Sequence, residues 1–302
     1  MSASPQPPAS RPAPRGAVVV TGASRGIGEA CALRLAAAGF HVFAGVRRAA
    51  DGEALRQEAG GALSPLLLDV TSAASLAAAA SVVDAAVGQG GLAGLVNNAG
   101  IAVPAPLEFL PPEELRRQFE VNVVGQLAAT QAFLPALRRA RGRIVNMSSV
   151  SGLIASPMLG AYATSKFALE AMSDVLRLEL SLWGLHVVVI EPGSVATSIW
   201  ETSLGRGEAI LAAAPGAAAL YGPAIAAARR FARRRAAAGL RPDVVARAVE
   251  HALTAPRPKT RYLVGADARL GALVRRLPDR VRDWLLLRRY DRHWPPRARP
   301  AE

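Results

Sequence analysis

Short runs of apolar and β-branched residues alternate along the chain with longer segments rich in alanine, leucine and arginine. The short runs are continuous rather than alternating, which is typical of strands buried on both faces of a sheet. The longer segments have the length of crossover helices. The expected strands are residues 17–20, 42–46, 66–68, 94–96, 143–147, 186–190 and 261–264, and the expected helices include 27–38, 73–87, 112–137 and 162–183.

This order of strand, helix and strand predicts an α/β fold with one doubly wound parallel sheet of about seven strands and helices on both faces. The 302 residues suit one large domain of this kind. Ligands bind such sheets beyond the carboxyl ends of the strands. We expect a flexible Pro-rich leader over 1–15, the domain over 16–270 with a substrate loop over about 198–240, and a basic extension over 271–302.

The first expected strand runs directly into a glycine-rich turn, Thr21-Gly22-Ala23-Ser24-Arg25-Gly26-Ile27-Gly28, that opens a helix. Glycine permits a tight turn and a close approach of phosphate, and the helix N-terminus offers free N–H groups. The spacing G-x-x-x-G-x-G differs from the general dinucleotide fingerprint, so a plain turn stays an alternative for this motif alone. In its context the turn predicts a phosphate-binding site.

The end of the second strand bears on the choice of dinucleotide. An acidic residue there binds a free ribose 2′-hydroxyl, whereas arginine suits a 2′-phosphate. The strand ends in Val46-Arg47-Arg48 with no acid, and Arg25 lies in the glycine turn. This favours NADP(H). NAD(H) stays the alternative because arginine is abundant throughout: only Lys166 and Lys259 are lysines among the 36 basic residues.

Polar residues follow three further strands: Asp69, Asn97-Asn98-Ala99-Gly100 and Ser148-Ser149. After them comes Tyr162-Ala163-Thr164-Ser165-Lys166, whose four-residue spacing places the tyrosine and the lysine on one face of a helix. A cation so placed stabilises tyrosinate and lowers a phenol pKa that is ordinarily about 10. General acid–base catalysis requires such a group.

As an ordered set these motifs resemble the short-chain dehydrogenase/reductase family over roughly residues 16–200. The resemblance rests on Thr21–Gly28, Asn97–Gly100, Ser149, Tyr162-x-x-x-Lys166 and Pro192-Gly193. It implies a Rossmann-type fold and a metal-free, NAD(P)-dependent oxidoreductase that transfers a hydride between the cofactor and an alcohol, ketone or aldehyde. Residues 198–240 resemble, more weakly, the branch acting on steroids, retinoids and other apolar substrates, and Trp200 and Tyr221 are candidate substrate contacts.

The resemblance also implies residue roles. Tyr162 would exchange a proton with the substrate oxygen, Ser149 would polarise that oxygen, and Lys166 would lower the tyrosine pKa and bind the nicotinamide ribose. Asn122 matches an asparagine that steadies a water in the proton relay. The implied cofactor-binding residues are Gly22, Ser24, Arg25, Gly26, Ile27, Gly28, Arg47, Asp69, Val70, Asn98, Ala99, Gly100, Tyr162, Lys166, Pro192, Gly193, Val195 and Thr197.

The formal net charge of +13 is concentrated in the last third of the chain. Residues 1–198 hold 15 basic and 14 acidic residues, whereas residues 199–302 hold 21 and 9. Five arginines crowd residues 229–235, and nine more lie from Arg275 to Arg299, interrupted by Trp284-Leu285-Leu286-Leu287. This segment could contact an anionic membrane surface, attract an acidic substrate, or form a solvated face in an arginine-rich protein.

The alternative to an enzyme is a non-catalytic dinucleotide sensor that binds partners through this basic third. Nucleic-acid binding is not expected, because no recognition module is present and few aromatic residues lie among the arginines. A single cysteine, Cys31, excludes an internal disulfide framework and a thiolate metal site. We expect a cytoplasmic protein, possible contact with a membrane periphery, and, from the family resemblance, a homodimer or homotetramer.

Overall fold

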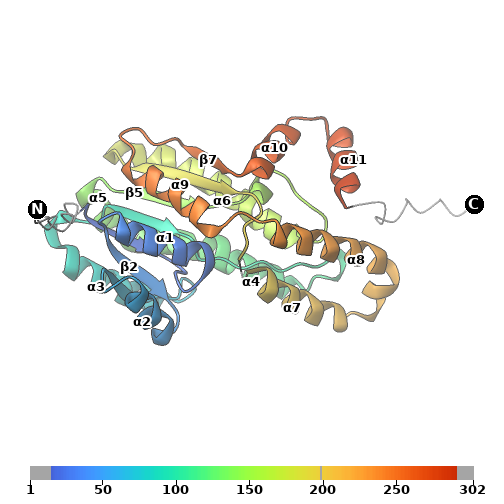
Figure 1. Cartoon of the computed structure of the whole chain (residues 1–302), viewed down its shortest axis with the longest axis horizontal. Coiled ribbons are helices and arrows are strands. Elements are labelled where there is room, and N and C mark those ends of the chain that lie inside the picture. The colour runs from blue at the N-terminus through green and yellow to red at the C-terminus, as the bar shows by residue number, and fades with distance from the viewer. Residues whose placement is uncertain (1–14, 198, 291–302) are drawn as a thin grey trace, which may run out of the picture.

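The computed structural model describes residues 15–197 and 199–290 (Figure 1). Seven parallel strands form one sheet in the order β3-β2-β1-β4-β5-β6-β7, as the pattern of apolar runs predicts. The order reverses direction at β1, where the chain crosses from β3 to β4. The strands are β1 (Ala17–Val20), β2 (His41–Val46), β3 (Leu63–Leu67), β4 (Gly94–Asn97), β5 (Arg143–Met147), β6 (His186–Pro192) and β7 (Arg261–Val264).

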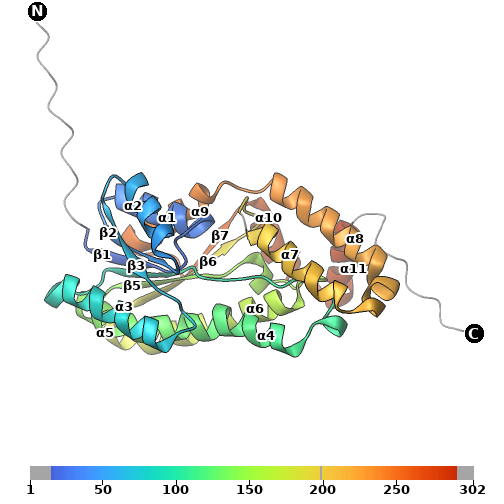
Figure 2. The ribbon, with the colours of Figure 1, turned by 90° about the horizontal axis from the view of Figure 1, so that it is seen from below.

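Helices cover both faces of the sheet and bury two apolar cores (Figure 2). One face carries α1 (Gly26–Ala37) and α9 (Pro242–Thr254), which pack against each other. The other face carries α3 (Ala73–Val87), α5 (Gly125–Ala140) and α6 (Gly160–Leu180). Cys31 lies fully buried in the first core, and burial raises the pKa of its thiol to about 12. It packs as a small hydrophobe.

Two expected elements were placed wrongly. The third strand begins at Leu63 and ends at Leu67 rather than covering 66–68. It includes Pro65, which is tolerated because β3 lies at the sheet edge, where a missing N–H costs little. The expected helix over 112–137 is divided into α4 (Pro112–Phe119), a π-helical turn (Glu120–Val124) and α5.

Beyond the carboxyl ends of the strands, the segment expected as a substrate loop forms two long helices. These are α7 (Ile199–Ala212) and α8 (Pro215–Ala237), which pack side by side. Their alanine-rich sequence explains this, because alanine has the highest helix propensity. The remaining helices are α2 (Ala49–Glu58), α10 (Ala266–Val274) and α11 (Asp279–Arg289).

Most of the expected leader, and the end of the expected basic extension from residue 291, lie outside the described residues. Within the described ranges, no helix combines the length and apolar character needed to cross a bilayer.

Candidate active site

A cavity of about 1490 Å³ opens at the carboxyl ends of the strands, under α7 and α8. Single-ligand pockets commonly enclose about 300–1,000 Å³. The volume therefore suffices for a dinucleotide together with a second molecule. The glycine turn lines one part of the cavity, and apolar residues of α7, α8 and α11 line another.

The glycine turn is tied to the end of β4 by Asn98. Its side-chain amide donates to the backbone oxygens of Thr21 and Gly22, at 3.0 and 3.1 Å. Gly28 packs so closely beneath these groups that a Cβ would overlap the Gly22 carbonyl. Gly22 and Gly26 have φ of +65° and +64°, a region that favours glycine. The turn thus keeps its backbone open at the N-terminus of α1, which suits a pyrophosphate.

The glycine turn and the end of β2 together form a polar part of the cavity, which we call the cradle. Arg25 of the turn and Arg47 after β2 lie here. Both line the cavity, and Arg25 reaches across to the Thr202 hydroxyl of α7 at 3.4 Å. Arg48 forms a double hydrogen bond with Asp51 at 2.9 and 2.6 Å, which lowers the pKa of that carboxyl. For Arg47, the described residues provide no salt bridge. The arrangement leaves the Arg47 guanidinium available to an anionic ligand group.

Asp69 follows β3 and lines the cavity together with Val70. Its Oδ1 accepts hydrogen bonds from the backbone N–H and hydroxyl of Thr71, at 2.9 and 2.7 Å. The backbone hydrogen bond from Thr71 is the main cause that lowers the Asp69 pKa. Asp69 is therefore held as a carboxylate that can accept a hydrogen bond from a ligand.

Ser149, Tyr162 and Lys166 meet at the middle of the cavity. Burial raises the pKa of Tyr162, and a hydrogen bond with Ser149 lowers it. The Lys166 Nζ lies 5.7 Å from the centre of the Tyr162 ring and donates to the Met147 carbonyl oxygen at 2.7 Å. Burial lowers the pKa of Lys166 to about 8, while the negative charge of Glu170 raises it. The three groups can hold a substrate oxygen and exchange a proton with it.

Asn122 occupies the π-helical turn and is fully buried. Its Oδ1 accepts from the Ile101 N–H at 2.9 Å, and its Nδ2 donates to the Ile101 carbonyl oxygen at 3.0 Å and to the Ser165 hydroxyl at 3.1 Å. The π-helical turn thus holds the Asn122 amide in the interior of the protein. The sequence pattern predicts one uninterrupted helix over 112–137. π-turns inside helices recur at functional sites.

Pro192 at the end of β6, and Gly193, Val195 and Thr197 in the loop that follows, line the cavity wall. Asp267, at the start of α10, anchors it: Oδ2 accepts from the Ser194 N–H at 2.7 Å and from Arg235 of α8 at 3.0 Å. Sequence reasoning missed Asp267. Its position just after β7 was the available signal, because polar residues at strand ends line such sites.

The part of the cavity beyond Tyr162 is mainly apolar, and its arginines lie beside acids. Arg206 pairs with Glu114, Arg229 lies 3.6 Å from Glu208, and Arg235 pairs with Asp267. The apolar lining residues include Ile101, Val103, Ile154, Met158, Leu204, Leu211, Ile225, Phe231, Leu286 and Tyr290. Because the charges are paired, this chamber suits a neutral apolar molecule better than an anion.

Every residue expected to bind cofactor or take part in catalysis lines the cavity, except Asn122, which lies behind the loop at Ile101. Tyr221 is not among the lining residues; its hydroxyl donates to Glu108 at 2.8 Å, and its ring packs edge-on against Phe109. The Trp200 side chain lies outside the described part of the chain. Thr202 and Asp51 are lining residues that the sequence did not single out.

Comparison with known proteins agrees with the family resemblance that the sequence motifs show. Residues 16–205 match the family model for short chain dehydrogenases. The chain is 39% identical to mouse (Mus musculus) retinol dehydrogenase 5 over 293 residues, which cover 92% of this chain and 91% of that protein. It is 36% identical to an NADPH-dependent 3-dehydrocapnine reductase of Ornithobacterium rhinotracheale over 271 residues, covering 88% of this chain and 94% of the relative.

A solved structure shares both fold and family name. It is a short chain dehydrogenase from Burkholderia cenocepacia J2315 in complex with NADP. The TM-score is 0.69 at 26% identity, covering 91% of this chain and 98% of that one. The parallel sheet described above is thus the arrangement that a dinucleotide-binding relative uses.

Proposed function

Because the chain belongs to the short-chain dehydrogenase family, we propose that it is an NADP(H)-preferring enzyme acting on a neutral, lipophilic alcohol or carbonyl compound. The family match and the relatives' names make it an oxidoreductase that uses a nicotinamide cofactor on a small molecule. The proposal of a lipophilic substrate rests on one observation: the polar and the apolar parts belong to a single cavity. The Tyr162–Ser149 hydroxyl pair lies where the polar dinucleotide cradle meets the apolar chamber.

The proposed chemistry divides between cofactor and protein. A nicotinamide dinucleotide bound in this cavity supplies or accepts the hydride. Ser149 holds the substrate oxygen, and Tyr162 gives or takes the proton at that oxygen. The Lys166 ammonium stabilises the tyrosinate form electrostatically, and Asn122 holds the loop at Ile101 in place.

The preference for NADP(H) rests on the charge around the cradle. Arg25 and Arg47 both line it, and no acidic residue ends β2. Asp51 also lines this part of the cavity, and Arg48 pairs with it. A 2′-phosphate would therefore meet two guanidinium groups and no acid at the end of β2. One compared relative is named as NADPH-dependent, and one compared structure is a complex with NADP, which agrees with this choice.

The experiment that tests this function is a fluorescence titration of the purified protein with NADPH and NADH, followed by turnover on a panel of neutral ketones, aldehydes and retinoids. We expect tighter binding of NADPH and reduction of apolar carbonyl compounds in preference to keto acids. Tighter binding of NADH would overturn the cofactor assignment. Preferred turnover of keto acids would overturn the substrate class, and cofactor binding without any turnover would favour a sensor.

A homo-oligomer is the proposed assembly, formed through the outer face of α6. Along this helix and the 3₁₀ turn that follows it, apolar side chains are exposed at Phe167, Val175, Leu178 and Leu182. Leu178 and Leu182 are 64% and 81% exposed. A stripe of this kind is typical of an interface between subunits. Sedimentation analysis should show a dimer or tetramer, and Leu178→Glu should shift it toward monomer.

Contact with an anionic membrane surface is proposed for α10 and α11. Leu273 and Trp284 are 61% and 53% exposed, and the Arg288 guanidinium lies 4.6 Å from the centre of the Trp284 ring. Arginines flanking exposed apolar side chains suit a negatively charged lipid surface. Cosedimentation with vesicles containing phosphatidylglycerol, but not with pure phosphatidylcholine vesicles, would support it; equal absence from both pellets would refute it.

A further inference from the structure

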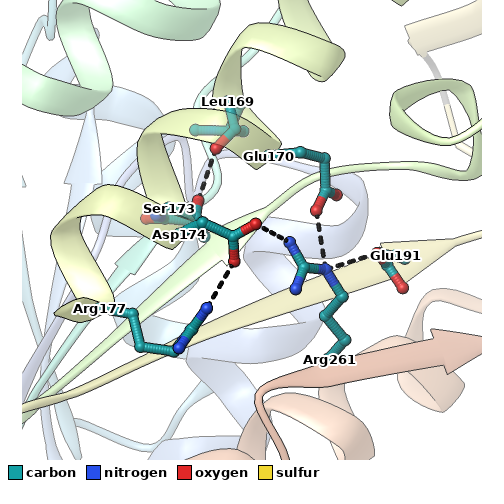
Figure 3. A network of polar contacts seen from close by, with 8 residues as sticks. Leu169, Glu170, Ser173, Asp174, Arg177, Glu191 and Arg261 are labelled. Carbon is teal, nitrogen blue, oxygen red and sulfur yellow. Dashed lines mark hydrogen bonds and ion pairs between the residues drawn. The ribbon is translucent and has the colours of Figure 1, made fainter.

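Two buried carboxyl groups lie behind the active site, in a network that the proposed reaction does not use (Figure 3). Glu170 lies on α6, one helical turn after Lys166, and is 7% exposed. Glu191 lies on β6, directly before Pro192, and is 1% exposed. One side chain therefore follows the lysine of the site, and the other precedes the loop that lines the nicotinamide end.

Both carboxyl groups face one guanidinium group, that of Arg261 at the start of β7. The Arg261 Nε donates to Glu170 Oε2 at 3.1 Å and lies 3.4 Å from Glu191 Oε1, without forming a hydrogen bond there. Its Nη2 donates to Asp174 at 2.9 Å, and Asp174 also accepts from Arg177. Arg261 thus contacts three carboxyl groups. Arg177 contacts only Asp174, the most exposed of the three.

Two buried oxygens in this cluster, Glu170 Oε1 and Glu191 Oε1, accept no hydrogen bond from the described residues. If both groups were ionised, two negative charges would be buried beside the single Arg261 guanidinium, which is unfavourable. A single proton between them would satisfy both atoms. Carboxyl pairs that share a site behave in this way.

The cluster also touches the active site directly at Gly152. A Cβ there would lie 2.8 Å from the Ser148 hydroxyl, 3.0 Å from Glu170 Cγ and 3.1 Å from the Lys166 carbonyl oxygen. The absence of a side chain at Gly152 lets Glu170 lie beneath the strand end that carries Ser148 and Ser149. Its charge is accordingly felt at Lys166, whose pKa it raises.

We propose that Glu170 and Glu191 share one proton up to neutral pH, with Glu191 donating to Glu170. In this state Glu170 carries the negative charge that keeps the Lys166 ammonium protonated. Glu170 is then a positioning residue that acts through Lys166, and Glu191 holds it in place. The inference rests on the role proposed above for Lys166.

The surrounding charges agree with this distribution. Burial and the neighbouring Glu170 charge raise the pKa of Glu191 to about 7, whereas Arg261 and the more distant Arg275 lower it. Lys166, Asp174 and Arg177 are the other charged groups of α6 near the pair. Glu170 has the more direct contact with Arg261 and lies closer in sequence to Lys166. It is therefore the better place for the anion.

The test measures kcat/KM as a function of pH and compares the alkaline limb of this profile in Glu170→Gln, Glu191→Gln and the wild type. Asp174→Asn serves as the matched control, because it removes a carboxylate from Arg261 on the solvent side. We expect Glu170→Gln to move the limb about one pH unit lower, as loss of a nearby opposite charge lowers a lysine pKa. Glu191→Gln should move it much less, and Asp174→Asn should leave it in place. Equal shifts in all three variants, or none in Glu170→Gln, would overturn the proposal.

A second measurement needs neither turnover nor a stable Glu170 variant. Infrared difference spectra of the whole protein between pH 5 and 9 should show the carbonyl stretch of a protonated carboxylic acid that disappears near pH 7. The band should be missing from Glu191→Gln and present in Asp174→Asn. A spectrum without this band would refute the shared proton. The spectrum does not depend on activity. A protein that shows the band but no dehydrogenase activity would therefore contradict the proposed function and not the shared proton.

Discussion

The carboxylate of Asp267 occupies the space that a Cβ on Gly193 would need. Gly193 lies in the loop after β6, and Asp267 lies at the start of α10, beyond β7. The same carboxylate accepts hydrogen bonds from the N–H groups of Ser194 and Ala268 and pairs with Arg235 of α8. One side chain thus joins the loop after β6 to α8, which lines the apolar part of the cavity.

Gly193→Ala should therefore displace the loop rather than merely fill space. We expect cofactor affinity and kcat/KM to fall about 5- to 150-fold, since overpacking at such a contact costs about 1–3 kcal/mol. Gly90→Ala is the control, because no atom lies within 4 Å of the Cβ it would add. Calorimetric titration with NADPH measures the effect. Wild-type affinity in Gly193→Ala would show that the loop does not contact the cofactor.

Tyr162→Phe should separate cofactor binding from chemistry. The variant removes the hydroxyl that hydrogen-bonds with Ser149 but retains the ring beside Lys166. We expect kcat to fall by about 10²–10⁴, the usual contribution of a general acid or base. The dissociation constant for NADPH, measured by fluorescence, should change little. Undiminished turnover would exclude Tyr162 as the proton-transferring group.

Arg47→Ala should weaken NADPH binding and leave NADH binding nearly unchanged. Hydrogen bonds to charged groups contribute about 1.5–3 kcal/mol, so a loss of about 10- to 100-fold in NADPH affinity is expected. Arg56→Ala, which breaks an exposed pair with Glu53 on α2, provides the control. Parallel losses for both dinucleotides would mean that Arg47 does not contact a 2′-phosphate.

Glu191 should make stability fall between about pH 5 and pH 7. Its folded-state pKa of about 7 lies above the ordinary 4.5, so the folded protein binds the proton more tightly than the unfolded chain. The resulting stabilisation is complete below the unfolded pKa and is lost as the pH rises through the folded pKa. At 1.36 kcal/mol per pKa unit, the loss is about 3 kcal/mol.

Urea unfolding at several pH values measures this dependence. In Glu191→Gln the decline between pH 5 and 7 should flatten, because glutamine has no proton to lose. Glu179→Gln, which removes an exposed carboxylate of α6, should keep the wild-type slope. An identical slope in Glu191→Gln would show that Glu191 ionises normally.

The fold was largely accessible from the sequence because its signals are local. Continuous β-branched runs predicted all seven strands, and only β3 was misplaced, since Pro65 interrupts its pattern. The helix pairing of Tyr162 with Lys166 follows from a four-residue spacing. The π-helical turn at Asn122 was missed, and the hydrogen bonds that hold Asn122 there join it to Ile101, 21 residues away, outside any local pattern.

What the sequence by itself determined was the order of strands and helices, the glycine turn and the residue types at the strand ends. Only the tertiary structure brought Asp267 against Gly193, placed acids beside the arginines of the chamber, and enclosed Glu170 and Glu191 around Arg261. The physical reason is the distance along the chain over which each interaction acts. Periodicity and spacing act within one element, whereas burial and shared charge depend on segments that meet only when the sheet has formed.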